Sequence, residues 1–289
     1  KALAVFSSDA LSSVAYATQE ILIPLSFFSM AAMNWSLPIA LGIAILLIVV
    51  ATSYWQTIRS YPNGGGAYIV VLDNLGVKPA LVTAAALLID YILTVSVSIA
   101  AGVEALASAM PFLFEYRILL GCVAIAIVTL INLRGVRESG TVFSIPTYLF
   151  IFAFLLLIGA GFYQIANGTL VAKAPLFHET YPTLSLFLIL RAFASGCAAL
   201  TGIEAISNGV PAFRNPESKN AQITLFWMAF ILTSFFLSIT ALAHFLGVVP
   251  SETETVISIL GRQIFAGGPL YYLVQGSTAL ILFLAANTS

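Results

Sequence analysis

The stretch Phe6-Ser-Ser-Asp-Ala-Leu-Ser-Ser13 decides the fold of this chain, together with a second stretch, Ala194-Ser-Gly-Cys-Ala-Ala-Leu-Thr-Gly-Ile-Glu204. Each places small and hydroxyl-bearing residues and one acid inside a segment that is otherwise apolar enough to cross a membrane. Such runs let the backbone leave the regular helix where it lines a cavity rather than lipid. We therefore predict a break in the helix at both stretches. The alternative is that the Gly and Ser residues only permit close helix packing.

The composition around these stretches identifies the class of protein. Hydrophobic residues make up 60% of the 289 residues and charged residues only 8%, and the mean hydropathy is +1.03. A soluble domain has about 25% charged residues, so this is an integral membrane protein. The charges cluster in short connectors, which argues against a nucleic-acid partner. Cys122 and Cys197 lie in apolar runs and are expected to be buried free thiols.

Apolar windows of about 20 residues, the length that crosses roughly 30 Å of hydrocarbon, predict an all-α polytopic membrane protein. The candidate spans are residues 3–30, 36–58, 80–109, 119–133, 142–166, 185–208, 222–247 and 269 to the end. The two predicted breaks stand five spans apart, which is typical of transporters built from inverted repeats with a binding site at the midplane. We expect one transmembrane transporter domain, 1–289. Residues 1–167 would form a first five-helix repeat and 185–289 a second repeat, truncated after about seven to eight spans in all.

The basic residues predict the orientation, since cytoplasmic connectors are enriched in Lys and Arg. If the amino terminus is inside, the cytoplasmic side carries the larger number of basic residues. That side would carry Lys1, Arg59, Lys78, Arg134, Arg137, Arg214 and Lys219, against Arg117, Lys173 and Arg262 outside.

Three acids, Asp9, Asp90 and Glu204, lie within predicted spans. A carboxylate at the centre of a membrane helix costs roughly 2.5–3.5 kcal/mol, so these acids are expected to face a cation or a water-filled pathway. On the third span, Asp90, Thr94 and Ser98 fall within an arc of about 80°, at 100° per residue. One face of this helix is therefore predicted to be polar.

These groups suit a dehydrated monovalent cation, because carboxylates, hydroxyls and freed carbonyls can replace its hydration shell. Several carboxylates around one small cation would leave excess negative charge, so one of them would bind a proton. Asp90 and Glu204 are the candidates for proton coupling. Tyr16 and Tyr91 adjoin the acids and are expected at the site, with ordinary core packing as the alternative for each. No cofactor is predicted, and no resident metal beyond the transported cation, since no metal-ligand spacing occurs.

Four runs together resemble the amino acid–polyamine–organocation (APC) permeases, and within that superfamily they are most similar to the KimA-type potassium importers. The runs are Ser7-Ser-Asp-Ala-Leu-Ser-Ser-Val-Ala-Tyr16, Tyr61-Pro-Asn-Gly-Gly-Gly-Ala-Tyr68, Asp90-Tyr-Ile-Leu-Thr94 and Leu200-Thr-Gly-Ile-Glu-Ala-Ile-Ser-Asn208. The Pro-x-Gly-Gly-like turn is shared widely across the superfamily, whereas the first and last runs are more discriminating.

The resemblance implies a LeuT-like fold and proton-coupled potassium uptake by alternating access, with K⁺ and H⁺ as the transported ions. It also implies a location in the plasma membrane, and a homodimer formed through a nucleotide-sensing cytoplasmic tail that this chain lacks. Matched residue by residue, the cation path would be lined by Asp9, Tyr16, Asp90, Tyr91, Thr94, Ser98, Thr201 and Glu204.

Two other functions compete with potassium transport. An amino-acid or polyamine permease of the same fold is the nearest rival; Asp9 in the first break would repel a substrate carboxylate but not a cationic amine. An intramembrane aspartyl protease built on Asp9 and Asp90 is disfavoured, because the Gly-x-Gly-Asp segment of such enzymes is missing. The chain is therefore expected to be a carrier and not an enzyme.

Overall fold

The computed structural model describes residues 2–134, 140–170 and 185–288. These ranges are helical throughout apart from turns, and they contain no strand, so the predicted all-α class is confirmed. Three residues used above lie outside the described ranges: Lys1, Arg137 and Lys173.

The amino-terminal segment is a broken helix, as predicted. It consists of α1 (Ala2–Phe6), α2 (Ser8–Ser12) and α3 (Val14–Phe28), interrupted at Ser7 and Ser13. The serine hydroxyls bond the backbone around the breaks: Ser12 Oγ donates to the Asp9 carbonyl at 2.7 Å, and Ser13 Oγ donates to the Ala10 carbonyl at 2.7 Å. Such local side-chain bonds compete with regular helix formation.

The second predicted break is also present. α9 (Leu186–Gly196) runs into the 3₁₀ turn η3 (Cys197–Leu200), and the short helix α10 (Ala205–Asn208) follows. Between η3 and α10 the backbone is not helical, and Gly202 has a φ of +77°, a conformation that glycine adopts without a steric cost.

Within the described ranges, six segments are long and apolar enough to cross a membrane, whereas the sequence windows suggested eight. The difference comes from the two breaks, which leave only pieces of 15 residues or fewer at the first and sixth spans. The six segments are Ala31–Ser60, Val77–Ala109, Pro111–Leu133, Ser144–Ala166, Glu217–Phe245 and Pro269–Thr288.

The main helices of these segments are α4 (Ser36–Ser60), α6 (Val77–Ala109), α7 (Arg117–Leu133), α8 (Gly140–Ala166), α11 (Glu217–Phe245) and α13 (Pro269–Thr288). Five further connector elements are η1 (Met30–Trp35), α5 (Gly66–Leu75), η2 (Pro111–Tyr116), η4 (Val210–Ala212) and α12 (Val256–Phe265). The apolar windows predicted none of η1, η2, η4 and α12 as separate helices, because they are short.

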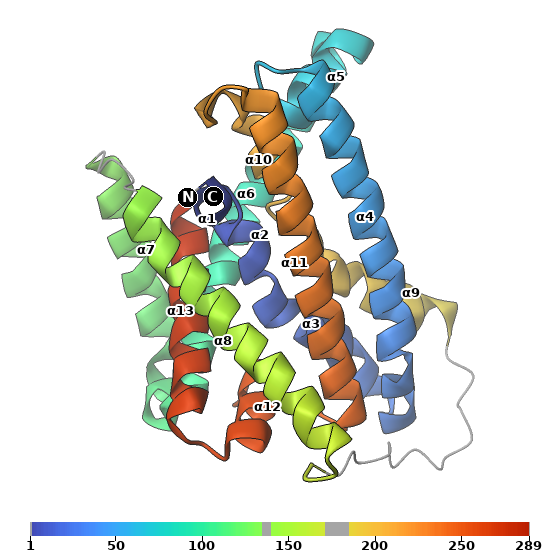
Figure 1. Ribbon diagram of the computed structural model, residues 1–289, viewed down its shortest axis with the longest axis vertical. Coiled ribbons are helices and arrows are strands. Elements are labelled where there is room, and N and C mark those ends of the chain that lie inside the picture. The colour runs from blue at the N-terminus through green and yellow to red at the C-terminus, as the bar shows by residue number, and fades with distance from the viewer. Residues whose placement is uncertain (1, 135–139, 171–184, 289) are drawn as a thin grey trace.

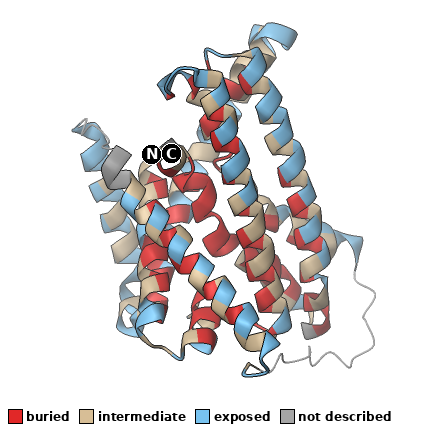
Figure 2. Cartoon of the chain, viewed as in Figure 1, coloured by how far each residue is buried: buried red, intermediate tan, exposed pale blue. Residues whose placement is uncertain are grey.

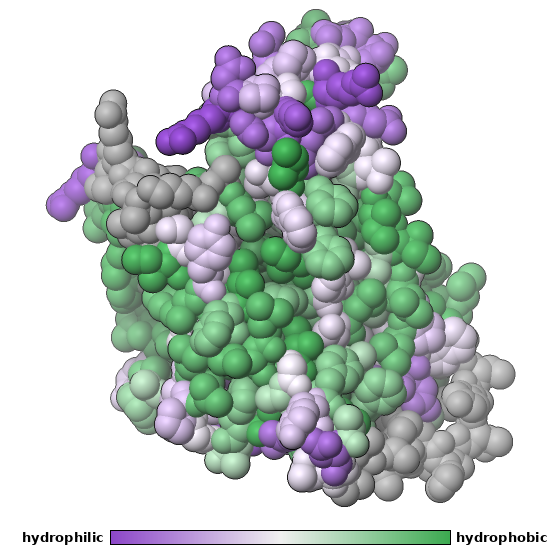
Figure 3. All heavy atoms as spheres, in the orientation of Figure 1, coloured by the Kyte–Doolittle hydropathy of each residue, from purple (hydrophilic) through white to green (hydrophobic). Residues whose placement is uncertain are grey.

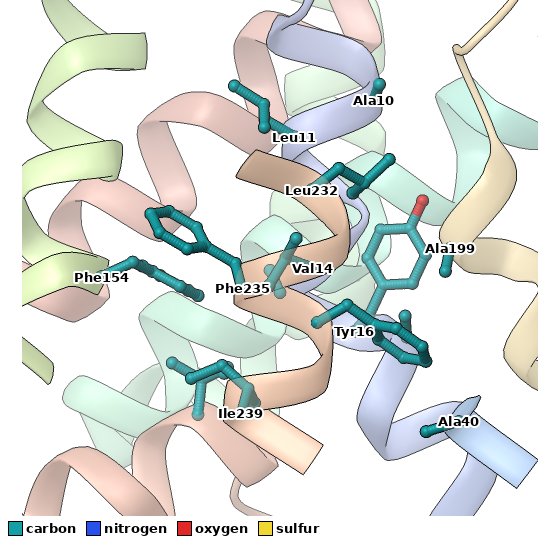
Figure 4. Packing of buried hydrophobic residues seen from close by; sticks show 14 of the residues in the cluster. Ala10, Leu11, Val14, Tyr16, Ala40, Phe154, Ala199, Leu232, Phe235 and Ile239 are labelled. Atoms are coloured by element: carbon teal, nitrogen blue, oxygen red, sulfur yellow. The ribbon is translucent and has the colours of Figure 1, made fainter. Parts of the chain in front are cut away.

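The core lies around the broken amino-terminal helix. α2 packs against α13, and α3 packs against α9 and α11 (Figure 1). Buried residues follow α2 and α3 and the inner faces of the helices around them, whereas the outer faces are exposed (Figure 2). In close-up, Val14 and Tyr16 of the amino-terminal helix meet Leu232, Phe235 and other apolar side chains of α11 (Figure 4). The broken segment is thus held in place by packing on several helices as well as by the hydrogen bonds of its helical pieces.

The outer surface suits lipid. Large hydrophobic side chains are exposed on α4, α6 and α11, and the hydrophobic surface ends where α4 ends and α11 begins, beneath a hydrophilic end of the molecule (Figure 3). Cys122 is free and exposed on α7, and Cys197 is free and half-buried. The predicted burial was therefore wrong for Cys122, because none of the residues of α7 is buried.

Candidate functional site

The two helix breaks meet at Asp9 and Gly202. A Cβ atom added to Gly202 would lie 2.7 Å from Asp9 Cγ and 2.8 Å from the Ala10 backbone nitrogen. Real Cβ atoms do not approach other atoms so closely, so this contact requires glycine. Asp9 is only 7% exposed. Its carboxyl group therefore lies directly against the irregular backbone of the second break.

Two hydrogen bonds join the same segments further along the chain. Ser13 Oγ donates to the Ala199 carbonyl at 3.1 Å, and the Tyr16 hydroxyl bonds with Thr201 Oγ1 at 3.2 Å. Thr201 Oγ1 also donates to the Ala198 carbonyl at 3.0 Å. Figure 4 shows the Tyr16 ring rising from α3 with its hydroxyl group on the side of Ala199. The predicted site residues Asp9, Tyr16 and Thr201 are thus close together.

Glu204 precedes α10 and brings a second carboxyl group to this region. It is 8% exposed and lies within electrostatic range of both Asp90 and Asp9. Tyr91, next to Asp90 on α6, accepts a hydrogen bond of 2.8 Å from Asn208 Nδ2 at the end of α10. The three predicted acids therefore belong to one electrostatic cluster, contributed by three segments far apart in the sequence.

The polar stripe predicted on the third span lies on the inner face of α6. Thr94 is 4% exposed and Ser98 is fully buried, whereas neighbours such as Leu93 and Val97 are exposed. Asp90 is half-buried. Thr94 and Ser98 follow Asp90 by roughly 6 and 12 Å along the helix axis. They continue the polar face away from the acids, and no hydrogen bond joins either side chain to the broken helices within the described ranges.

Three residues at the site were not among the predicted site residues. Gly202 and Asn208 lie in the run quoted for the family resemblance, so the signal was available but no role was assigned. Tyr54 of α4 lies within electrostatic range of Glu204, Tyr91 and Asp90. A single tyrosine in an apolar helix carries no sequence signal that separates it from a core residue.

The glycine-rich turn between α4 and α5 docks against the end of α10. A Cβ on Gly64, whose φ is +78°, would lie 2.7 Å from the Asn208 carbonyl oxygen, and a Cβ on Gly66 would overlap Asn208 Oδ1. The side chain of Asn208 therefore lies between this turn and Tyr91. The turn closes one end of the site region through backbone packing that only glycine permits.

The chemistry of the cluster is that of oxygen donors. Carboxylate, hydroxyl and backbone carbonyl oxygens converge at the two breaks, which suits a hard monovalent cation. In the part of the chain that the structure describes, neither Asp90 nor Glu204 forms an ion pair with Lys or Arg; the salt bridge present there joins Arg262 to Glu254 at 2.9 Å. The described residues also contain no group of three His, Cys, Asp or Glu side chains that could hold a resident metal ion.

Comparison with known proteins gives three findings. The amino acid permease family matches residues 1–289. The potassium transporter KimA of Bacillus subtilis is 48% identical over an alignment that covers 100% of this chain and 48% of that protein. The low-affinity putrescine importer PlaP of Escherichia coli K12 is 21% identical over 81% of this chain and 53% of its own length. The chain thus spans about half the length of these curated relatives.

Proposed function

Because the chain belongs to the amino acid permease family, we propose that it forms part of a secondary transporter that imports potassium ions by proton symport with alternating access. The observation that carries this proposal is the 48% identity to a potassium transporter along the entire chain. The converging carboxylates and hydroxyls at the two helix breaks support it independently, since they have the chemistry that a dehydrated potassium ion requires.

In this proposal the broken helices hold the ion. Asp9 supplies the charge, and Tyr16 and Thr201, which bond each other at 3.2 Å, supply hydroxyl oxygens. Thr94 and Ser98 continue the path along α6, and Tyr91 marks the end that the glycine-rich turn closes. In this proposal residues 1–167 form the first inverted repeat and residues 185–289 form part of the second, since a broken helix opens each one.

Proton coupling is assigned to Asp90 or Glu204. The two carboxyl groups lie within electrostatic range of each other. A proton on one of them therefore changes the negative charge that a bound cation meets, so proton binding and cation binding are linked. Asp90→Asn and Glu204→Gln keep the shape of each side chain but remove its titration. We expect one variant to lose the dependence of uptake on external pH; if both variants keep the wild-type pH profile, the protons move through other groups.

The location follows from the function. A potassium importer acts in the plasma membrane, where its amino terminus would face the cytoplasm according to the distribution of Lys and Arg. A homodimer, formed through a cytoplasmic tail of the kind that the family resemblance implies, is part of the same proposal. Labelling of an introduced Arg59→Cys with a membrane-impermeant thiol reagent, in intact cells and in opened cells, tests the orientation. Labelling in intact cells would show that position 59 faces the outside and that the predicted orientation is wrong.

A polyamine permease is the second candidate. It is favoured by the similarity to a putrescine importer and by Asp9, which can receive an ammonium group as well as a potassium ion. It is a less specific match, because 21% identity is well below the 48% shared with the potassium transporter.

One uptake experiment separates the two candidates. The complete protein is reconstituted into proteoliposomes, and rubidium entry is measured with and without an inward proton gradient, in the presence of putrescine or neutral amino acids. Potassium transport predicts gradient-stimulated rubidium entry that excess potassium blocks and putrescine does not. Putrescine entry without rubidium entry would move the assignment to the polyamine class and refute potassium import.

A further inference from the structure

An apolar groove runs between α4 and α11 on the outer surface of the molecule, away from the cation cluster. The two helices lie side by side (Figure 1). The groove encloses about 610 Å³, and its walls include Ile48 and Thr52 of α4 and Phe226, Ala229 and Phe230 of α11. Phe226 and Phe230 stack with ring centroids 6.4 Å apart and are both more than half exposed.

A polar cavity of about 740 Å³ adjoins this groove where α4 ends and α11 begins. Arg59, Lys219 and Glu217 line it, and Trp55 lines both the cavity and the groove. Gln222 Nε2 donates to the Trp55 carbonyl at 3.0 Å, which ties the two helices together at the junction. The hydrophilic end of the molecule in Figure 3 includes this region.

The dimensions fit one leaflet of a bilayer. From Gln222 at the junction to Ser234 at the far end of the groove, α11 rises roughly 18 Å at 1.5 Å per residue. Half of the hydrocarbon core is about 15 Å thick. Trp55 lies at the junction, and tryptophan is enriched at the boundary between hydrocarbon and headgroups. The groove therefore lies at acyl-chain depth and the polar cavity at headgroup depth.

We propose that this composite site binds an anionic phospholipid, with an acyl chain in the groove and the phosphate between Arg59 and Lys219. Two cations and one carboxylate, Glu217, line the headgroup cavity, so its charge is complementary to a lipid with a net negative charge and less so to a zwitterionic one. Basic pockets between transmembrane helices are a known type of site for anionic headgroups. None of these residues belongs to the proposed ion path, so the site is separate from the transport chemistry.

The test measures lipid retention on the complete protein by native mass spectrometry. The protein is titrated with dioleoyl phosphatidylglycerol or with dioleoyl phosphatidylcholine, which have the same acyl chains. The charge variant is Arg59→Gln with Lys219→Gln, and its control is Lys78→Gln, an exposed lysine outside the groove. The groove variant is Ala229→Phe, and its control is Ala85→Phe, an exposed alanine on α6.

We expect wild-type protein to prefer phosphatidylglycerol. Removing the two basic side chains should weaken the binding of phosphatidylglycerol by about 25-fold, at roughly fivefold for each cation near the headgroup. Ala229→Phe should weaken the binding of both lipids, and both control variants should bind each lipid as the wild-type protein does. Three outcomes would each overturn the proposal. The wild-type protein could retain the two lipids equally, or the charge variant could bind phosphatidylglycerol as well as Lys78→Gln does. Soluble glycerol phosphate could also displace the lipid at equal concentration.

Discussion

Replacing Gly202 with alanine perturbs the contact between the two broken helices at a single point. The new methyl group would lie 2.7 Å from Asp9 Cγ and Asp9 Oδ2 and 2.8 Å from the Ala10 nitrogen. Ordinary contact begins at 3.4 Å, so the neighbours must move by about 0.7 Å. The Ala10 nitrogen is backbone and cannot rotate away, which leaves displacement of Asp9 together with its helix.

Two costs add up in this variant. The positive φ of +77° at this position costs an alanine roughly 1–2 kcal/mol. Overpacking against Asp9 and Ala10 costs roughly 1–3 kcal/mol more. The first cost lowers the stability of the protein wherever it occurs. The second acts on the carboxyl group of Asp9, a ligand in the proposed ion site, and the same free energy expressed as lost cation affinity is between about 5-fold and 150-fold.

Gly267→Ala is the matched control. Gly267 has a φ of +72°, and a Cβ there would meet nothing within 4 Å, so this variant carries the backbone cost alone. Initial rates of rubidium uptake are measured against rubidium concentration in proteoliposomes, and thermal stability is measured on the same preparations. We expect both variants to be destabilised but only Gly202→Ala to require far more rubidium for half-maximal uptake. Equal rubidium dependence in the two variants would refute the role of Asp9 as the ion's main ligand.

Three further substitutions test other parts of the molecule. Asp9→Asn keeps the size of the side chain and removes its charge; uptake at low rubidium should fall at least tenfold, and an unchanged rate would exclude Asp9 from the ion path. Tyr16→Phe removes the hydrogen bond to Thr201, worth about 1 kcal/mol of folding stability, so Tm should fall slightly; loss of a hydroxyl oxygen from the proposed site should also raise the rubidium concentration for half-maximal uptake, and an unchanged concentration would show that Tyr16 only packs. Tyr271→Phe removes a buried hydroxyl with three hydrogen-bond partners, so the free energy of unfolding should fall by about 1–3 kcal/mol, as a lower Tm records, whereas Tyr272→Phe, 53% exposed, should not change it.

The sequence was sufficient to predict the helix breaks and the polar face of α6. Serine, glycine and an acid inside an apolar window have few explanations other than an irregular backbone, so both breaks were visible. The inward face of Thr94 and Ser98 followed from helical periodicity, since the other faces of that helix are apolar. The family resemblance added Thr201 to the site residues, which neither the burial of acids nor periodicity had singled out.

The contacts between segments were not predictable in the same way. The hydrogen bond between Asn208 and Tyr91 joins residues 117 positions apart, and nothing local to either residue indicates the other. The position of Tyr54 near the acids depends on how α4 packs beside α10. The exposure of Cys122 depends on which helices surround α7. These properties come from tertiary packing, which a single sequence does not encode in any short pattern.

The joint between the two broken helices has a mechanical consequence. Asp9 against Gly202, Ser13 with Ala199 and Tyr16 with Thr201 form three links within little more than two helical turns. Separating the two segments would break all three at once, whereas in the described part of the chain a single side-chain hydrogen bond, from Asn208, joins α10 to α6. In a conformational change, contacts held by few bonds separate before contacts held by many. The two discontinuous helices are therefore expected to move as one body rather than to separate from each other.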